Sequence, residues 1–253
     1  MRQVLAGALP YLLQNPLDGK AICCDNVNIH SHLVNEMARK LQTEIRKEQI
    51  AEAALGVVHA HGLRGLRMER VAQRVGIVPS ALYRHFSGKQ AVIDAMLDLI
   101  RGKLEGIVAA ASEEPLPPME RLRHLLRQHL TLVQHFQAIP RLLFSDEVCV
   151  GNPARKARIY ETISRYLEAV AGLVRQGQAD GSVRDDVDAD TVAVMYLGLF
   201  QPAAILMFMS DGGFDAARHI DRAWGAFCEG IAPSSSKVTP HSHNRPHAGA
   251  KRP

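Results

Sequence analysis

The chain has 253 residues, enough for one large domain or two smaller ones, and its composition of 47% hydrophobic and 22% charged residues excludes a wholly disordered chain. Aromatic residues make up only 5%, while Ala and Leu are abundant, which favours helices over sheets. The net charge of +4 is too small to indicate a partner until it is divided along the chain.

The charge is unevenly distributed. Residues 37–97 contain ten Lys or Arg and five Asp or Glu, a net charge of +5. Residues 98–232 contain fourteen basic and eighteen acidic residues, a net charge of −4. A basic segment of this length beside an acidic body is the kind of local charge that attracts polyanions such as nucleic acids.

The cysteines indicate a reducing compartment. Cys23, Cys24, Cys149 and Cys228 show neither a disulfide framework nor the paired spacing of metal ligands. We therefore expect reduced thiols, a cytoplasmic protein, no metal site and no cofactor. The apolar run at residues 4–13 lacks the flanking charge and cleavage site of an export signal.

One stretch is apolar enough to span a bilayer. It covers residues 191–209, with Gln201 and Pro202 at its centre and acidic residues on both sides. These features predict a buried helix and no membrane contact.

In chain order, residues 1–42 have no sustained period. We expect a flexible extension, or a translated stretch upstream of a natural start at Met37; an ordered arm is the alternative. From Thr43, the stripe of Ile50, Ala54 and Val58 predicts a helix that ends at Gly62.

Two short helices should follow. The first covers residues 67–75 and is followed by a tight turn at Gly76. The second covers residues 79–86, with Pro79 at the first position, where its missing N–H has no partner to lose. Residues 43–90 therefore resemble a helix-turn-helix, which places a recognition helix in the major groove of DNA.

A larger helical part covers residues 91–232. A capping box from Ser87 to Gln90 should open a long helix to Ala111. Further helices are expected at residues 118–137, 140–149, 153–178, 187–209 and 213–231, before a disordered tail at 233–253. The predicted fold class is all-α: a three-helix helix-turn-helix domain followed by a larger helical domain.

The recognition helix has two distinct faces. At about 100° per residue, Leu82 and Phe86 fall opposite Ser80 and Arg84. One face thus anchors the helix, while the other presents polar groups suited to phosphates and base edges. A solvated surface helix is the alternative. The candidate DNA-binding residues that this spacing indicates are Ser80, Tyr83, Arg84 and His85, with Lys89 at the start of the next helix.

These residues carry a resemblance to a known family. The run IAEAALGVVHAHG from Ile50, the pairs Val71-Ala72 and Gly76-Ile77, and LYRHF from Leu82 with Lys89 are similar to the TetR/AcrR-type regulators. The resemblance implies a homodimer in which each subunit reads half of a palindromic operator. It also implies phosphate contacts from Tyr83, His85 and Lys89, and base contacts around Pro79, Ser80 and Ala81.

Two positions depart from the family pattern. Val78 stands where a Ser or Thr usually caps the recognition helix, and Leu66 and Arg67 stand where a Thr is common. A lost N-cap hydroxyl costs about 1 kcal/mol, which Pro79 partly offsets. Arg67 would contact phosphate by charge instead of through a hydroxyl.

The resemblance also implies a ligand-binding and dimerising body, in which the last two long helices form a four-helix bundle with the partner subunit. The candidate dimer residues are Leu197, Leu206, Trp224 and Phe227. Candidates for a pocket for a small amphipathic effector are Phe144, Tyr160, Met195, Phe200 and Gln201; simple core packing is the alternative. Effector binding would shift the helix after Ser87 and change the spacing of recognition helices that must lie about 34 Å apart.

Two other functions remain open at this stage. One is a DNA-binding dimer that responds to no small molecule. The other is an all-helical enzyme, which the sequence disfavours because it has no nucleophile elbow, phosphate loop or convincing acid/base pair. The adjacent acids Asp146-Glu147 and Asp185-Asp186 point about 100° apart on a helix and are expected to be solvated or capping residues.

Overall fold

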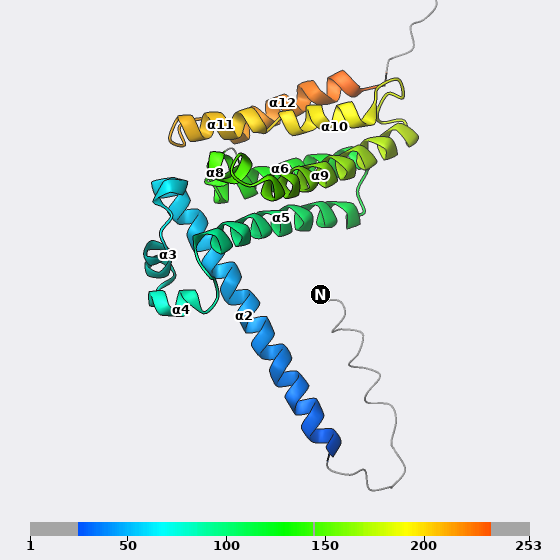
Figure 1. Cartoon of the computed structure of the whole chain (residues 1–253). Coiled ribbons are helices and arrows are strands. Elements are labelled where there is room, and N and C mark those ends of the chain that lie inside the picture. Colours follow the sequence, from blue (N-terminus) through cyan, green and yellow to red (C-terminus); the bar gives the residue numbers. More distant parts are fainter. Residues whose placement is uncertain (1–24, 144, 234–253) are drawn as a thin grey trace, which may run out of the picture. The chain divides into compact units, whose positions relative to one another are not determined.

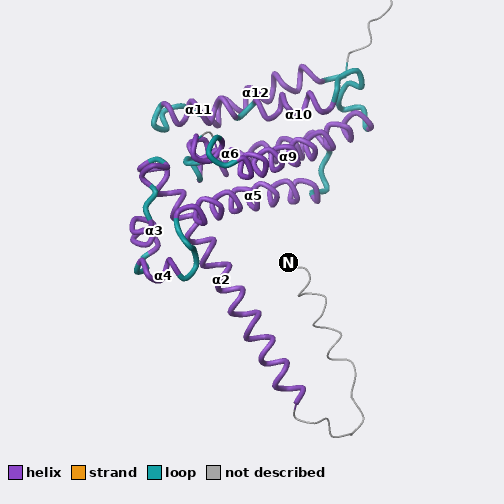
Figure 2. The backbone as a smooth tube through the Cα atoms, in the orientation of Figure 1, coloured by secondary structure: helices purple, strands orange, loops and turns teal. Residues whose placement is uncertain are grey.

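The computed structural model describes residues 25–143 and 145–233, with side chains from residue 35 onward. Within these ranges every regular element is a helix (Figure 2), so the predicted all-α class is confirmed. The chain divides into two compact units, residues 1–46 and 47–253. All the features described below lie in the second unit, except for the first part of α2.

Helix α2 (Asp25–His61) begins well before the predicted position at Thr43. Residues 25–42 are therefore helical, and the expectation of a flexible stretch there is wrong. Side chains 35–46 are all exposed, so they form no apolar stripe for periodicity to detect. From Ile50 onward the predicted stripe is confirmed, since Ile50, Ala54 and Val58 are fully buried. A natural start at Met37 stays a prediction.

The turn after α3 (Met68–Val75) is built by Gly76, as predicted. Gly76 adopts φ 78° and ψ 34°, the left-handed region that only Gly enters without strain. The N–H of Ile77 donates to Ala72 O at 3.0 Å, and that of Gly76 donates to Gln73 O at 3.2 Å. This Schellman pattern satisfies the last carbonyls of α3 and redirects the chain into α4 (Pro79–Tyr83).

Helix α5 (Lys89–Glu113) does not begin with the expected capping box. Its N-cap is Gly88, so Ser87 lies one position too early to cap it. The side chain of Gln90 bonds to Glu147 and Arg155 instead. The competing tertiary contacts explain why the local pattern fails here.

The body contains longer helices joined by short ones, with the bounds α6 (Pro118–His135), α7 (Ile139–Leu143), α8 (Asp146–Cys149), α9 (Pro153–Ala179), α10 (Ala189–Gly198), α11 (Gln201–Met209) and α12 (Ala216–Ile231). The predicted helix 140–149 is thus two short helices. The predicted helix 187–209 is interrupted between α10 and α11, at the kink expected from Pro202, which lies at the second position of α11. In Figure 1, α10, α11 and α12 form a layer beside α6 and α9, and α5 lies on the other side of that pair.

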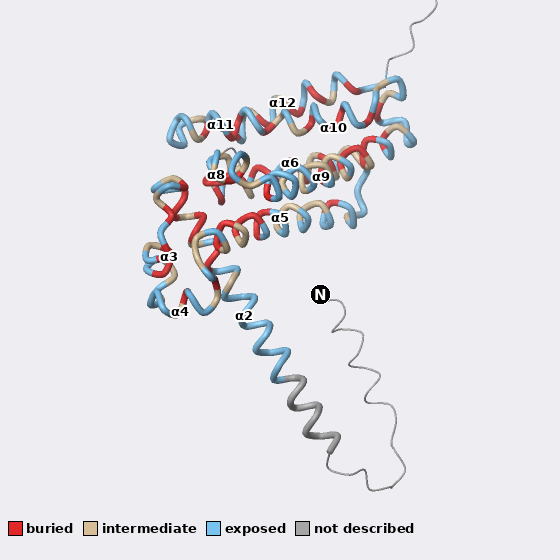
Figure 3. The backbone as a smooth tube through the Cα atoms, viewed as in Figure 1, coloured by how far each residue is buried: buried red, intermediate tan, exposed pale blue. Residues whose placement is uncertain are grey.

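Two hydrophobic clusters hold these helices together (Figure 3). The head core joins α2, α3, α4 and the first half of α5 with Ile139, Leu142 and Val148 of α7 and α8. The body core joins α6, α9, α10, α11 and α12. Helices α7 and α8 therefore pack with the N-terminal head formed by α2, α3 and α4, although they follow α6 in the chain.

Candidate nucleic-acid interface and internal cavity

The recognition helix is anchored on its predicted face. Leu82 is fully buried and Phe86 is 7% exposed, which confirms the apolar side of the helix. On the other side Tyr83 is 51% exposed, and Ser80 and Arg84 are also exposed. Regular helix ends at Tyr83, so Arg84 and the half-buried His85 lie in the turn that follows instead of in the helix.

The remaining DNA-binding candidates lie at helix starts. Arg67 is the exposed N-cap of α3, Pro79 is the first residue of α4, and Ala81 is half-buried one turn in. Neither Arg67 nor Val78, the N-cap of α4, makes a side-chain capping hydrogen bond. Both departures from the family pattern therefore leave helix N-termini without the hydroxyl that usually caps them.

Lys89 has an internal partner. Its Nζ lies 3.0 Å from Oε1 of Glu147 on α8, and both side chains are 32% exposed. Glu147, expected to be solvated or capping, therefore holds a residue for which we predict a phosphate contact. The sequence offers no signal for this pair, because the two residues are far apart in the chain.

A buried arginine ties the start of α9 to the start of α5. Arg155 is 4% exposed; its Nε and Nη2 lie 2.8 and 3.0 Å from the carboxylate oxygens of Asp94, and its Nη1 lies 2.6 Å from Oε1 of Gln90. The hydrogen bond from Arg155 lowers the pKa of the Asp94 carboxyl below its usual value. The sequence did not predict this contact, because arginine is usually exposed and no local pattern around Arg155 indicates that its side chain is buried.

A cavity of about 240 Å³ lies between the two cores. Its wall includes Ile100 and Ile139 of the head core and Val133 and Tyr166 of the body core. The full lining is Ile100, Leu104, His129, Leu132, Val133, Ile139, Pro140, Leu143, Cys149, Ile159, Ile163, Tyr166, Leu197, Phe200, Gln201, Ala204 and Ile205. A molecule bound here would touch both cores.

Two polar side chains face each other in the cavity wall. Nδ1 of His129 lies 3.0 Å from the hydroxyl of Tyr166, and the ring of His129 lies against Phe200 with centroids 3.7 Å apart. Burial lowers the pKa of His129 to about 3, so the ring is neutral at pH 7. Burial also raises the pKa of Tyr166 above its usual value. Neither residue was predicted to be part of a site, because each lies among apolar helix positions typical of core.

The predicted pocket residues separate into two groups. Phe200 and Gln201 line the cavity, but Tyr160 and Met195 are 73% and 54% exposed and do not. Periodicity gives the spacing of a face without its direction, so these two outward-facing residues were misplaced. Phe144 lies outside the described residues.

The predicted dimer residues also separate. Leu206 is 43% exposed, as a subunit contact requires. Leu197 lines the cavity, and Trp224 and Phe227 are 8% and 6% exposed in the body core. These two aromatic side chains are covered by the subunit itself, which corrects their placement at the dimer surface.

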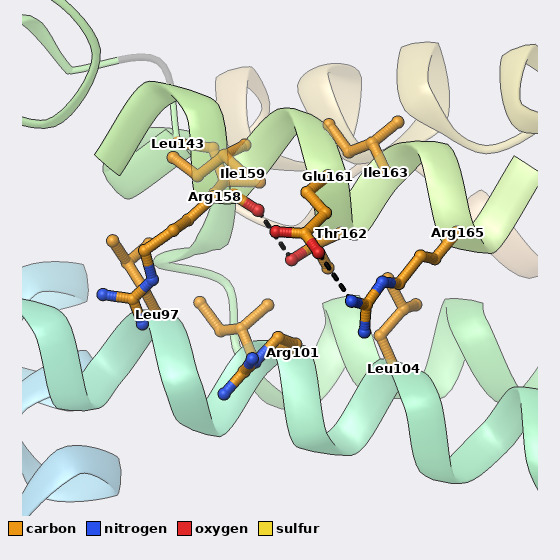
Figure 4. A pocket seen from close by; sticks show the side chains of 11 residues that line it. Leu97, Arg101, Leu104, Leu143, Arg158, Ile159, Glu161, Thr162, Ile163 and Arg165 are labelled. Atoms are coloured by element: carbon orange, nitrogen blue, oxygen red, sulfur yellow. Dashed lines mark hydrogen bonds and ion pairs between the residues drawn. The ribbon is translucent and has the colours of Figure 1, made fainter. Parts of the chain in front are cut away.

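A smaller hollow of about 80 Å³ lies between α5 and α9 (Figure 4). Figure 4 shows Leu104 rising from α5 towards Arg165 of α9, whereas the guanidinium of Arg101 stays beside α5. It shares Ile100, Leu104, Leu143, Ile159 and Ile163 with the larger cavity, so the two are neighbours.

The remaining expectations concern a metal site, the cysteines and the apolar stretch. Among residues 25–143 and 145–233, no three His, Cys, Asp or Glu side chains are placed to hold a metal ion. Cys149 and Cys228 are free thiols, while Cys23 and Cys24 lie outside the described residues. Residues 189–209 are long and apolar enough to cross a membrane, with a mean hydropathy of 1.9, and 39% of the most apolar window is buried.

Comparison with known proteins gives the family. Residues 50–96 match the model of bacterial regulatory proteins of the tetR family, and residues 115–228 match the tetracyclin repressor-like C-terminal domain. The HTH-type transcriptional regulator ArpR of Pseudomonas putida is 28% identical over 169 residues, which cover 62% of this chain and 80% of that protein.

Two solved structures share the fold. One is the transcriptional regulator FadR from Bacillus subtilis in complex with stearoyl-CoA, with a TM-score of 0.61 and 19% identity over 72% of this chain and 98% of that one. The other is a transcriptional regulator from Saccharomonospora viridis in complex with choline, with a TM-score of 0.64 and 19% identity over 75% and 98%. With both halves matched, the chain belongs to the TetR/AcrR family of helix-turn-helix transcriptional regulators.

Proposed function

We propose that the protein is a cytoplasmic repressor that binds a palindromic operator as a homodimer and is released by a small amphipathic molecule. The observation that carries DNA binding is the recognition helix. Its buried Leu82 and Phe86 fix the orientation in which Ser80, Tyr83 and Arg84 face outward. Such a face fits phosphates and base edges in a major groove.

The homodimer is supported by exposed apolar side chains on α10 and α11. Val194, Met195, Ile205, Leu206 and Met209 are each between 43% and 73% exposed. On neighbouring α12, the exposed positions include Gly225, Ala226 and Gly230, which are small enough for another helix to approach closely. A second subunit that covered both surfaces would bury them and complete the four-helix bundle of the family.

A membrane could also cover an apolar surface, but the body disfavours it. Residues 189–209 pack one side into the body core, and Asp188 and Asp190 stand at the start of the stretch. Because α10 and α11 are separated at Leu199 and Phe200, the stretch is not one continuous helix. Subunit contact explains the exposed side better than lipid does.

The cavity supports an effector because of where it lies. A ligand between the head core and the body core acts on α7 and α8, which contribute to the cavity wall. From α8, Glu147 reaches Lys89, and from the start of α9, Arg155 reaches Asp94. A shift of these helices would therefore be passed to the first turns of α5, and so to the recognition helices.

An enzymatic role has no support among the described residues. Of the adjacent acids, Glu147 pairs with Lys89 and Asp186 pairs with Arg184, so neither pair faces a common reaction site. A regulator uses binding alone, which the exposed recognition helix and the cavity both suit.

The DNA-binding proposal is tested by fluorescence anisotropy with DNA from upstream of the protein's own gene, at several salt concentrations and with random competitor. Wild type should bind tightly, resist competitor and show a steep salt dependence. Tyr83→Ala should weaken binding at least tenfold, whereas Tyr160→Ala, which removes another exposed Tyr, should not. If the protein binds neither this upstream DNA nor any fragment in a selection from the whole genome, the proposal is wrong.

A further inference from the structure

The cavity wall carries no charged side chain. None of its seventeen described lining residues is Lys, Arg, Asp or Glu, and the ring of His129 is neutral at pH 7. A charged ligand group placed here would lose its hydration without gaining an opposite charge, which is strongly unfavourable. The cavity therefore selects against ions.

The nearest arginines do not change this balance, because each has a carboxylate or carbonyl partner. In the neighbouring hollow, Arg101 and Arg158 both pair with Asp98, and Arg165 pairs with Glu161. Arg141, beside Pro140 of the cavity wall, donates to the carbonyl of His59 and lies 4.4 Å over the ring of Phe208. An anionic head group would have to break these pairs to be bound.

Of the polar side chains in the wall, His129 has a ring nitrogen left for a ligand. His129 is 8% exposed and lines the cavity, and its Nδ1 is occupied by the Tyr166 hydroxyl. No hydrogen bond from its Nε2 to the described residues is seen, and this nitrogen is not among the side-chain atoms that are both fully buried and without a partner, so a molecule in the cavity can reach it. A neutral imidazole can donate from Nε2 to a carbonyl or accept there from a hydroxyl.

The volume limits the size of the partner. An apolar cavity of about 150 Å³ is large enough for benzene, so one of about 240 Å³ accommodates on the order of ten non-hydrogen atoms. Gln201 is exposed and also lines the cavity, so a longer molecule could extend past it towards solvent.

Resting on the effector role proposed above, we propose that this cavity binds an uncharged lipophilic molecule with one hydroxyl or carbonyl group, which hydrogen-bonds His129. The apolar part lies between Ile100 and Ile139 on one side and Val133 and Phe200 on the other. The polar group fills the position that Nε2 leaves without a partner.

A matched eight-carbon series tests the charge selection. The purified full-length protein is titrated with 1-octanol, 2-octanone, octanoate and octylammonium, with binding measured by calorimetry and by the rise in unfolding temperature. Each neutral compound should bind at least tenfold more tightly than either ion. Equal or tighter binding of octanoate or octylammonium overturns the proposal, as does an absence of binding by both neutral compounds.

Variants test the position of the polar group. His129→Leu should weaken 1-octanol binding about tenfold, while Tyr160→Ala, at the exposed position, should leave it unchanged. If His129→Leu does not fold, Tyr166→Phe keeps the shape of the wall and frees Nδ1, which should change the relative affinity for 1-octanol and 2-octanone at least threefold. Unchanged affinities in the variant that folds overturn the role of His129.

Measurements of operator binding by the same purified protein distinguish a failure of this proposal from a failure of the DNA-binding proposal. Operator binding is measured first without any probe and then with each neutral compound. Operator binding that persists while no neutral compound binds leaves the DNA-binding function standing and overturns the ligand class. Tight binding of the neutral compounds by a protein that retains no DNA supports the ligand class and overturns the regulator.

Discussion

Lys89 is placed where two negative groups compete for it. Its ammonium pairs with Glu147 within the subunit, yet it also lies at the start of α5, where the family resemblance implies a DNA phosphate. The side chain can satisfy only one of these partners fully. We therefore predict that Glu147 lowers operator affinity in proportion to the strength of its own ion pair.

Glu147→Gln should raise operator affinity. A partly exposed ion pair is worth about 0.5–1 kcal/mol, so its loss should tighten operator binding about two- to fivefold. Anisotropy titrations at several salt concentrations measure the effect, with Glu168→Gln, which removes the carboxylate paired with Arg175, as the control. Weaker binding by Glu147→Gln, or the same gain in Glu168→Gln, would contradict this competition.

His129 should make stability depend on pH. Burial disfavours the charged form of the ring and lowers the pKa of His129 from its usual 6.5 in the unfolded chain to about 3 in the folded protein. The lowered pKa means that the contribution of His129 to stability is largest above pH 6.5 and is lost as the pH falls below that value. The other titratable residues of the cavity wall are Tyr166 and Cys149, and no acidic side chain among the described residues lines the wall to stabilise a protonated His129. At about 1.4 kcal/mol per pH unit, the loss between pH 7 and pH 5 is about 2 kcal/mol.

Urea unfolding at the two pH values measures this loss. Wild type should lose about 2 kcal/mol more than His129→Gln, which cannot take up the proton. His61→Gln, at an exposed position, should behave like wild type. Equal pH dependence in wild type and His129→Gln would show that the buried ring does not control it.

At the scale of elements, the turn between α3 and α4 depends on a single backbone conformation. An added Cβ at Gly76 would meet no atom within 4 Å, so the cost of Gly76→Ala comes from its φ of 78° alone. That cost is about 1 kcal/mol of unfolding free energy. Gly102→Ala is the control, since Gly102 lies inside α5 with similarly open space, and there the same change should stabilise by about 0.5–1 kcal/mol. Chemical denaturation of both variants gives the two signs, and a neutral or stabilising Gly76→Ala would refute the strain.

Elements with one buried face could be predicted from the sequence. The stripe at Ile50, Ala54 and Val58 and the Gly76 turn each carry a local signal, and the structure has them as expected. The exposed first part of α2 could not be recognised, because a helix without a buried face leaves no periodic pattern. The expected cap at Ser87 failed because Glu147 and Arg155, which no local rule relates to Gln90, bind its side chain.

For the whole molecule, the recognition face could be predicted and the cavity could not. Leu82 and Phe86 follow helical spacing, so their burial is readable from the chain. The cavity depends on how seven helices pack together, which the spacing of residues along one helix does not encode. Tyr160 was expected in the cavity wall and is exposed at the surface, whereas His129 lines the cavity and was not predicted to do so. Trp224 was placed at a subunit surface because the family resemblance assigns its helix to the dimer, but its own subunit covers it.

The proposed homodimer makes a prediction at this scale. Leu206→Asp should convert the protein to a monomer, because it would place a charge among the apolar side chains that the partner covers. Analytical ultracentrifugation measures the mass in solution. Val150→Asp, at a side chain that is 76% exposed near α8, should leave the assembly intact. A Leu206→Asp protein that keeps the mass of wild type would place the subunit contact elsewhere.

The position of the cavity between two cores also constrains how this regulator can diverge. Ile100 and Ile139 both shape the cavity and stabilise the DNA-binding head, so a substitution that admits a new ligand there also weakens the head. Ile163, Gln201 and Ile205 line the cavity but belong to neither core. Changes of ligand preference during evolution should therefore accumulate at these three positions, where selectivity can drift while the fold is conserved.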